Sequence, residues 1–343
     1  MLRALLISVS LLFSYSYANE DVKKGEFLGA KHIEAFPSWF KTSFLDFSDD
    51  ISEAKDANRH VLIYFHQDGC PYCAKTVEEN FANENIINKL KPNFDVIEIN
   101  MWGDRSLTDW NGKEFTEKEF AAHMKVQFTP TMIFLNGQSE IVLRLNGYHS
   151  IDRMVNILDF VNTKQYIQES FASFIAKKTA VKQGNLNQNS LFEAGPHFLS
   201  RSSRLPAEKY LAVFFEEPNC PECDQFHKEI INTKVSRDYL SRMQVVQLNA
   251  LSEEKLITPQ GKRTTAKDWY SDLDLTYKPA IVFFDKDGQE IVRRDAFFKE
   301  FHTHGMMTYV LSNAFKTQPS FQRYLEDKAD RLREQGITVD LWK

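Results

Sequence analysis

The sequence has few cysteines, no excess of basic residues and no long apolar run. Four cysteines among 343 residues are too few for the disulfide framework of small secreted domains. Lys and Arg number 42 against 47 Asp and Glu, a formal charge of -5. No nucleic-acid partner is therefore expected, because such proteins need a basic surface to neutralise phosphates. The apolar run at residues 4–13 is about half the roughly 20 residues that a membrane-spanning helix needs.

The N-terminus has the pattern of a secretory signal peptide. Arg3 precedes the apolar run, and the small residues Ser16 and Ala18 stand three positions and one position before a cleavage point after Ala18. The sequence therefore predicts a signal peptide over residues 1–18 and an exported protein that is soluble after cleavage. An uncleaved N-terminal anchor is the alternative.

All four cysteines belong to two Cys-x-x-Cys pairs, and the sequence around the pairs repeats. An apolar run at 61–65 leads to the first pair, and an apolar run at 211–215 leads to the second pair 150 residues later. Downstream, Pro130 and Pro279 match at a shift of 149 residues, each just before another apolar run. A nearly constant shift across several blocks indicates a duplicated domain.

Each repeat has the pattern of a compact α/β unit. The short runs rich in Val, Ile and Phe are typical of buried strands. Asn136-Gly137 and Asp287-Gly288 are strong hairpin signals, and they predict that 132–135 pairs with 141–145 and that 281–284 pairs with 290–293. The predicted organisation is a first domain at 30–167, a linker at 168–203, a second domain at 204–317 and a tail helix within 318–343.

The spacing of the cysteines points to redox chemistry. Residues three apart face the same side of a helix, so the two sulfurs of each pair can meet. Cys70 and Cys220 come first, where the helix N-terminus favours a thiolate, so they are the expected nucleophiles. Cys73 and Cys223 would resolve the mixed disulfide. The proline after each nucleophile suits the first helical turn.

These motifs together resemble the thioredoxin superfamily. The features that carry the resemblance are Cys70-Pro71-Tyr72-Cys73 with Thr129-Pro130, Cys220-Pro221-Glu222-Cys223 with Lys278-Pro279, and an insert around Trp102–Phe120 similar to that of exported bacterial members. The resemblance implies an α/β fold of two tandem thioredoxin-like domains, each with a mixed central sheet flanked by helices, working in the periplasm without a cofactor. It also implies that the two prolines are cis and face the disulfides. Extended substrate backbone would then bind at Thr129, Pro130, Lys278 and Pro279 and at the dipeptides Pro71-Tyr72 and Pro221-Glu222.

The implied function is that of a thiol–disulfide oxidoreductase, a reductase or isomerase that acts on protein disulfides. A reductase in an oxidising compartment needs an electron source, so a membrane electron donor is a candidate partner. The alternatives are a non-catalytic binding module, a pair of structural disulfides, or a metal carrier in which His66 or His227 adds a third ligand. A structural disulfide is disfavoured, because a bond that closes a loop of only a few residues removes little entropy from the unfolded chain. A metal carrier is disfavoured because neither repeat has an obvious fourth ligand.

The two repeats differ around their cysteines. Many thioredoxins carry a buried acid six residues before the first cysteine, but Tyr64 and Phe214 stand there in this chain. The candidates for proton transfer are then Asp68, His66, Glu216, Glu217 and water. The second pair is surrounded in sequence by more acids than the first, and negative charge disfavours a thiolate. The sequence therefore predicts that the second pair is the more reducing one.

Overall fold

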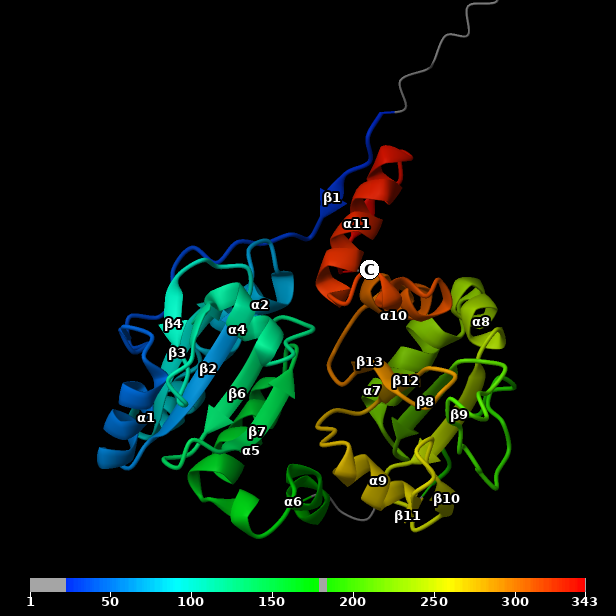
Figure 1. Cartoon of the computed structure of the whole chain (residues 1–343), viewed down its shortest axis with the longest axis horizontal. Helices are drawn as coiled ribbons and strands as arrows, with labels where there is room; N and C mark the ends of the chain where they lie inside the picture. The colour runs from blue at the N-terminus through cyan, green and yellow to red at the C-terminus, as the bar shows by residue number, and fades with distance from the viewer. Residues whose placement is uncertain (1–22, 179–183, 343) are drawn as a thin grey trace, which may run out of the picture.

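The computed structural model describes residues 23–178 and 184–342, which form two α/β domains (Figure 1). The predicted signal peptide at 1–18 lies outside the described residues. Within the two described ranges, no helix has the length and apolar character needed to cross a membrane.

The first domain has the predicted α/β character. Its elements are α1 (Phe47–Asp56), β2 (His60–His66), α2 (Pro71–Lys75), the π-helical turn η1 (Thr76–Asn80), α3 (Glu84–Asn93), β3 (Phe94–Asn100), β4 (Ser106–Thr108), β5 (Glu114–Thr116), α4 (Glu117–His123), β6 (Thr131–Leu135), β7 (Ile141–Asn146) and α5 (Ile151–Asn162). The central sheet has the order β3-β2-β6-β7. It is mixed, because β3 is parallel to β2 whereas β6 and β7 are antiparallel to their neighbours.

The second domain repeats this plan. Its elements are β8 (Leu211–Glu216), α7 (Pro221–Phe226), the π-helical turn η3 (His227–Ile231), α8 (Lys234–Ser241), β9 (Gln244–Asn249), β10 (Lys255–Ile257), β11 (Arg263–Thr265), α9 (Ala266–Asp272), β12 (Ala280–Phe284), β13 (Glu290–Arg294) and α10 (Glu300–Leu311). The sheet order β9-β8-β12-β13 is equivalent to that of the first domain. The predicted fold class is therefore confirmed, and both predicted hairpins are present.

Both sheets are buried on their two faces. Along β2, alternate side chains enter two different apolar clusters, one with Val61 and Ile63 and the other with Leu62 and Tyr64. Strand β8 divides its side chains in the same way. This alternation follows from the two-residue period of a strand, and it explains why both strands appear in the sequence as continuous apolar runs.

Each domain is followed by further helical elements. After α5 come η2 (Gln165–Ile167) and α6 (Phe171–Lys178), and after α10 come η4 (Ala314–Lys316), α11 (Phe321–Glu334) and β14 (Val339–Asp340). Helix α6 stands in the predicted linker at 168–203, where burial of Phe171 anchors it. Helix α11 lies in the predicted tail, and β14 pairs in parallel with β1 (Phe27–Leu28) near the N-terminus.

The two domains meet through equivalent segments. Tyr148, after β7, forms an antiparallel bridge with Phe297, which holds the equivalent place after β13. The preceding residues are also equivalent, and a Cβ atom on Gly147 would lie 2.4 Å from the Cβ of Ala296. Only glycine therefore permits this close approach without a shift of the neighbouring chain. Equivalent residues of the two repeats therefore contact one another, as in a local two-fold arrangement.

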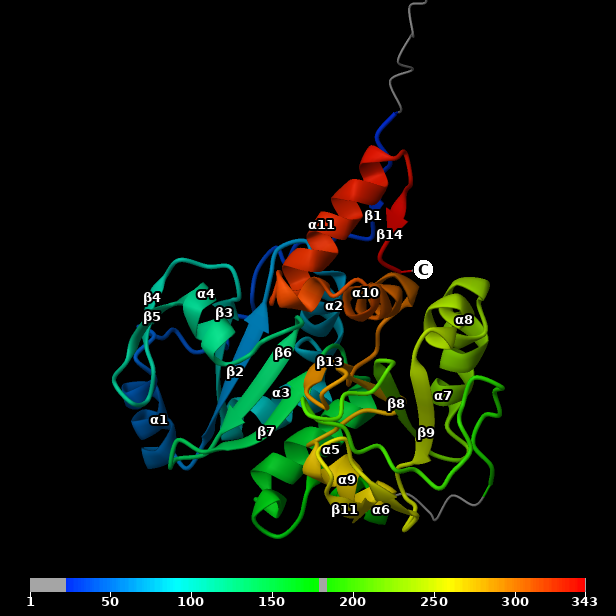
Figure 2. The same ribbon diagram turned by 45° about the vertical axis from the view of Figure 1, so that its right-hand side comes forward.

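The helices after each domain reach across to the other one. Figures 1 and 2 show α11 at the top, where the two domains meet, and α6 at the bottom, toward the second domain. The ring of Phe321 in α11 lies 5.5 Å from that of Phe128 in the first domain. Ala172 in α6 packs against an apolar cluster of the second domain. Each domain therefore covers part of its neighbour with its own C-terminal extension.

Candidate active site

The two cysteine pairs occupy the same position in their domains. Cys70 and Cys220 are the N-caps of α2 and α7, and the Sγ of each accepts a hydrogen bond of 3.1 Å from the backbone N–H of its partner cysteine. The S–S distances are 2.18 Å for Cys70–Cys73 and 2.12 Å for Cys220–Cys223. Both pairs are thus disulfides at helix N-termini, where the helix dipole stabilises a thiolate after reduction.

The predicted proline loops lie next to the disulfides in the chain fold, before β6 and β12. The peptide bonds Thr129–Pro130 and Lys278–Pro279 are both cis, as predicted. In the first domain the Thr129 hydroxyl donates to the Cys70 Sγ at 3.4 Å, and the carbonyl oxygen of Thr129 lies 3.5 Å from the same sulfur. The first loop therefore contacts its disulfide directly. A third cis bond, Gly195–Pro196, has no counterpart among the sequence predictions.

Lys278 in the second loop lies among polar and aromatic side chains. Its ammonium group forms an ion pair with Glu217 and lies 5.5 Å from the centre of the Tyr270 ring. Glu217, one of the predicted candidates for proton transfer, is thus held beside the cis-proline loop.

The residues between the cysteines differ sharply in exposure. Pro71 and Tyr72 are buried, whereas Pro221 and Glu222 are exposed. All four were predicted to meet substrate, and only those of the second domain present their side chains to solvent. The two centres are therefore alike in backbone geometry but unlike in the exposure of the dipeptide between the cysteines.

Tyr72 is buried by the second domain and by the C-terminal segment. Its hydroxyl donates to the Leu341 carbonyl oxygen at 3.4 Å and accepts from the Lys299 backbone N–H at 3.3 Å. Four further rings surround it at centroid distances of 5.2–6.3 Å, those of Phe297, Phe298, His302 and Trp342. Burial raises the pKa of Tyr72 to about 12, so the hydroxyl remains a hydrogen-bond donor.

Neither domain has an acid six residues before its first cysteine, where Tyr64 and Phe214 stand, and the two domains have different polar groups nearby. In the first domain the Tyr64 hydroxyl donates to the Cys73 carbonyl oxygen at 3.1 Å, and burial raises the pKa of Tyr64. In the second domain Glu216, four residues before Cys220, is fully buried and accepts hydrogen bonds from Gln247 at 3.0 Å and from the His227 ring at 2.7 Å. The second domain therefore holds a buried carboxylate that the first lacks at this position.

The histidines considered as metal ligands bind carboxylates instead. His66 lies 2.9 Å from Glu98, and His227 lies 2.7 Å from Glu216. Within residues 23–178 and 184–342, no group of three Cys, His, Asp or Glu side chains is arranged to hold a metal ion.

Arg294 is a buried charge that the sequence reasoning missed. Its two terminal nitrogens donate to the carbonyl oxygens of Pro279 at 2.8 Å and Phe298 at 3.1 Å, and its guanidinium carbon lies 4.1 Å from the centre of the Phe226 ring. Burial lowers the pKa of Arg294 to about 10. Arg294 thus ties the second cis-proline loop to the segment that covers Tyr72. The signal was present, because an arginine stands where the equivalent residue of the first repeat is Leu145.

A second buried charge follows directly. Asp295 accepts hydrogen bonds from the backbone N–H groups of Thr276 and Tyr277 at 2.9 and 2.7 Å. Burial nevertheless raises the pKa of Asp295 to about 6. The carboxyl group holds the start of the second cis-proline loop, and the equivalent residue of the first domain is Asn146.

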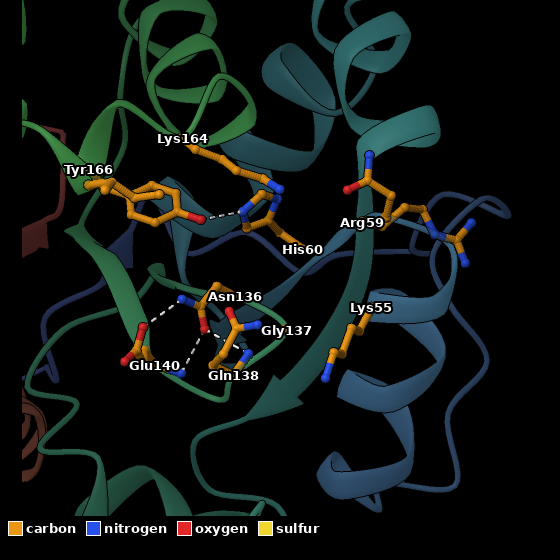
Figure 3. Close-up of a pocket in the computed structure, with 11 residues that line it drawn as sticks. Lys55, Arg59, His60, Asn136, Gly137, Gln138, Glu140, Lys164 and Tyr166 are labelled. Atoms are coloured by element: carbon orange, nitrogen blue, oxygen red, sulfur yellow. Dashed lines mark hydrogen bonds between the residues drawn. The ribbon is translucent and has the colours of Figure 1, made fainter.

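The pocket in Figure 3 is separate from both disulfides. It has a volume of about 460 Å³ and is lined by residues that include Lys55, Arg59, His60, Lys164 and Tyr166. His60 begins β2, whereas the first cysteine pair follows the other end of that strand. The pocket therefore lies at the opposite pole of the first domain.

The fold and the paired cysteines define a class of protein, and a family comparison agrees. The sequence matches the Thioredoxin-like domain family twice, over residues 47–162 and 204–296, which together make up more than half of the chain. The protein belongs to the thioredoxin-like family, and it contains the family's domain in tandem. The fold and the Cys-x-x-Cys pairs support thiol–disulfide oxidoreductase chemistry. No curated protein sequence matches the chain significantly.

Several solved structures from bacteria are partly similar to this chain. A thioredoxin-fold protein from Helicobacter pylori is 17% identical, with a TM-score of 0.35, and the match covers 42% of this chain and 91% of that one. A thioredoxin from Thermus thermophilus is 24% identical, with a TM-score of 0.29 and coverage of 35% and 85%. A disulphide isomerase from Xylella fastidiosa Temecula1 is 13% identical, with a TM-score of 0.22 and coverage of 38% and 87%. Because these scores are low, the fold assignment rests on the family match and the sheet order.

Proposed function

We propose that the protein is an exported thiol–disulfide oxidoreductase, a reductase or isomerase that acts on protein disulfides. The observation that carries this proposal is the second centre, where Cys220 caps a helix beside a cis-proline loop and the intervening Pro221 and Glu222 are exposed. The exposed dipeptide offers a protein chain a surface beside Cys220, which is itself 3% exposed.

The reduction of a substrate runs in two exchange steps. The Cys220 thiolate attacks a substrate disulfide, one substrate sulfur leaves as a thiolate, and a mixed disulfide forms. The Cys223 thiolate then attacks Cys220, the second substrate sulfur leaves, and the Cys220–Cys223 disulfide forms. Two electrons pass to the substrate, whose two thiolates take up protons. The Cys70–Cys73 pair has the same chemistry available to it.

A reductase cycle needs a dithiol that restores the reduced enzyme. We propose a membrane electron donor as that partner, since the compartment itself is oxidising. Export rests on the N-terminal pattern of Arg3, the apolar run at 4–13 and Ala18. Sequencing the N-terminus of the periplasmic protein is expected to find Asn19 first, and an uncleaved Met1 would contradict the signal peptide.

The test of the activity is a reduction assay with trapping variants. With dithiothreitol as electron donor, the wild-type protein is expected to accelerate the reduction of insulin disulfides. Cys223→Ser removes the resolving thiol, so it is expected to accumulate a mixed disulfide through Cys220. The matched control Cys220→Ser keeps Cys223 and is expected to trap far less. If no cysteine variant forms a mixed disulfide and the purified protein carries stoichiometric metal, the metal-carrier alternative is favoured.

A further inference from the structure

The dipeptide of the first centre is covered by the chain's own C-terminal half. The two nucleophilic cysteines are equally buried, with Cys70 4% and Cys220 3% exposed, so the centres differ at the dipeptide, where Tyr72 is 1% exposed and Glu222 is exposed. The residues that cover the first dipeptide and the neighbouring loop are called the cap and are Phe297, Phe298, His302, Phe321, Leu341 and Trp342. Cys70, Tyr72, Cys73 and Phe128 share one apolar cluster with the core of the second domain. The cap therefore continues that core across the first active site.

The cap covers the loop next to the sulfur as well as the dipeptide between the cysteines. Phe128 immediately precedes the Thr129–Pro130 loop, and its ring lies 5.1 Å from Phe298 and 5.5 Å from Phe321. The backbone N–H of Phe321 also donates to the Gln127 side chain at 3.4 Å. The cap therefore lies on both surfaces that flank Cys70.

Among residues 23–178 and 184–342, the second centre has an equivalent contact but no equivalent cover over its dipeptide. Tyr277, which corresponds to Phe128, faces His149 at a ring distance of 6.2 Å. Within the described residues, the extension that crosses to the second domain, α6, has 8 residues, whereas α11 has 14 and is followed by β14. The exposed Pro221 and Glu222 show that α6 and its neighbours leave the second dipeptide open.

The far end of the cap is held by a short strand pairing and by burial of Val339 and Leu341. Strand β14 has two residues paired with β1, and Trp342 is 37% exposed. The Trp342 ring contacts Tyr72 at 5.2 Å and the Lys75 ammonium at 5.9 Å. Short edge pairing and partial exposure are features of segments that open at low free-energy cost.

We propose that the cap is a lid that keeps protein partners away from the Cys70–Cys73 disulfide, so that protein partners exchange with Cys220–Cys223 while the lid is closed. This inference rests on the proposed oxidoreductase function and adds its regulation. A protein partner must displace the cap from Tyr72 and Phe128 before it can exchange with the first disulfide. The apparent rate of this exchange is therefore reduced in proportion to the fraction of molecules that are open. A small dithiol needs a much smaller opening.

The test compares the two disulfides in full-length protein. Cys220→Ser/Cys223→Ser leaves only the first pair, and Cys70→Ser/Cys73→Ser leaves only the second. Each is reduced with thioredoxin, a protein dithiol, or with dithiothreitol, and the free thiols are counted by alkylation at timed intervals. For each protein we take the ratio of the rate of reduction by thioredoxin to the rate of reduction by dithiothreitol. This ratio is expected to be lower for the first pair than for the second by about tenfold or more, the value for a lid that is open about one-tenth of the time or less.

Two cap variants in the first-pair protein test the lid itself. Trp342→Ala removes a half-exposed ring, and Phe321→Ala removes the buried anchor of α11. Both are expected to accelerate reduction by thioredoxin several-fold and to leave the dithiothreitol rate within about twofold. The control is Phe44→Ala, which removes a fully exposed ring and is expected to change neither rate. The same variants in the second-pair protein are expected to have no effect, which shows that the fold is intact.

Failure of the lid and failure of the oxidoreductase proposal give different results. If thioredoxin reduces both pairs with the same preference over dithiothreitol, or if neither cap variant accelerates the first pair, the lid is wrong and the oxidoreductase proposal stands. If thioredoxin reduces neither pair while dithiothreitol reduces both, exchange with protein partners is itself contradicted.

Discussion

The two domains have one backbone plan and two different surroundings for their cysteines. Each places a disulfide at a helix N-terminus beside a cis-proline loop. In the first domain the dipeptide of the motif carries Tyr72, whose ring is buried by the neighbouring domain, and in the second it carries Glu222, which is exposed. The difference teaches that duplication preserved the chemistry of the centre while the residues around it were adapted to opposite environments.

Exchanging the central residues tests this difference most strongly. Tyr72→Glu removes a buried ring and places a carboxylate among the aromatic residues of the cap, with an expected loss of about 3–5 kcal/mol in the free energy of unfolding. The reverse exchange, Glu222→Tyr, occurs at an exposed position and is expected to change stability by about 0.5 kcal/mol or less. Urea unfolding of both variants measures the comparison, and equal losses would show that the two environments do not differ.

The residues that hold the second cis-proline loop predict a pH dependence. The pKa of Asp295 rises from 3.8 in the unfolded chain to about 6 in the folded protein, so the folded state favours the protonated form. The contribution of Asp295 to the free energy of unfolding is fully present below about pH 4 and is lost as the pH rises through 6. The change is on the order of 3 kcal/mol. Asp295→Asn introduces the residue of the first domain.

Urea unfolding at a series of pH values checks this prediction. The stability of Asp295→Asn relative to the wild type is expected to increase between pH 4 and pH 7. A constant difference would contradict the burial argument for this carboxyl group.

The buried pair of His227 and Glu216 predicts a smaller difference in stability between the two domains. His227→Ala leaves the fully buried Glu216 with Gln247 as its remaining side-chain partner, at an expected cost of about 2–3 kcal/mol. In the first domain His66→Ala leaves Glu98 paired with Arg105 at 2.8 Å, and the expected cost is about 1 kcal/mol. Thermal unfolding of the two variants gives the comparison, and a larger loss for His66→Ala would reverse it.

The smallest expected difference between the two centres is in the reduction potentials of their disulfides. Glu222 and Asp224 beside the second pair are exposed, so solvent screens their effect on the thiolates. The second pair is expected to be more reducing by about 30 mV, which is about 1.4 kcal/mol for a two-electron couple. Equilibration of each single-pair variant with glutathione measures both values. A first pair that is equally or more reducing would contradict the prediction.

The sequence predicted the fold and the backbone of both centres because those features depend on local patterns. Apolar runs, turn dipeptides and the Cys-x-x-Cys spacing determine the strands, the hairpins and the helix N-termini. Pro130 and Pro279 stand where a cis bond was expected, and both are cis.

The surroundings of the centres could not be predicted in the same way. Burial of Tyr72 depends on Leu341 and Trp342, which are about 270 residues away in the chain. A periodic sequence pattern predicts local structure and does not predict a contact between residues so far apart. The same limit applied to α6 and to the pairing of β1 with β14, because elements this short are stabilised by neighbours rather than by their own sequence. The apolar Tyr72 and the charged Arg294 were the signals, since each differs in chemical type from its counterpart in the other repeat.

The pairing of β1 with β14 has a consequence for how the molecule is made. Strand β14 (Val339–Asp340) stands far downstream in the chain, whereas all the strands of the first domain sheet are complete by Asn146. Domains generally fold as units, N-terminal first. The first domain sheet can therefore form before β14 and Trp342 pack over Tyr72, and during that interval its dipeptide is uncovered.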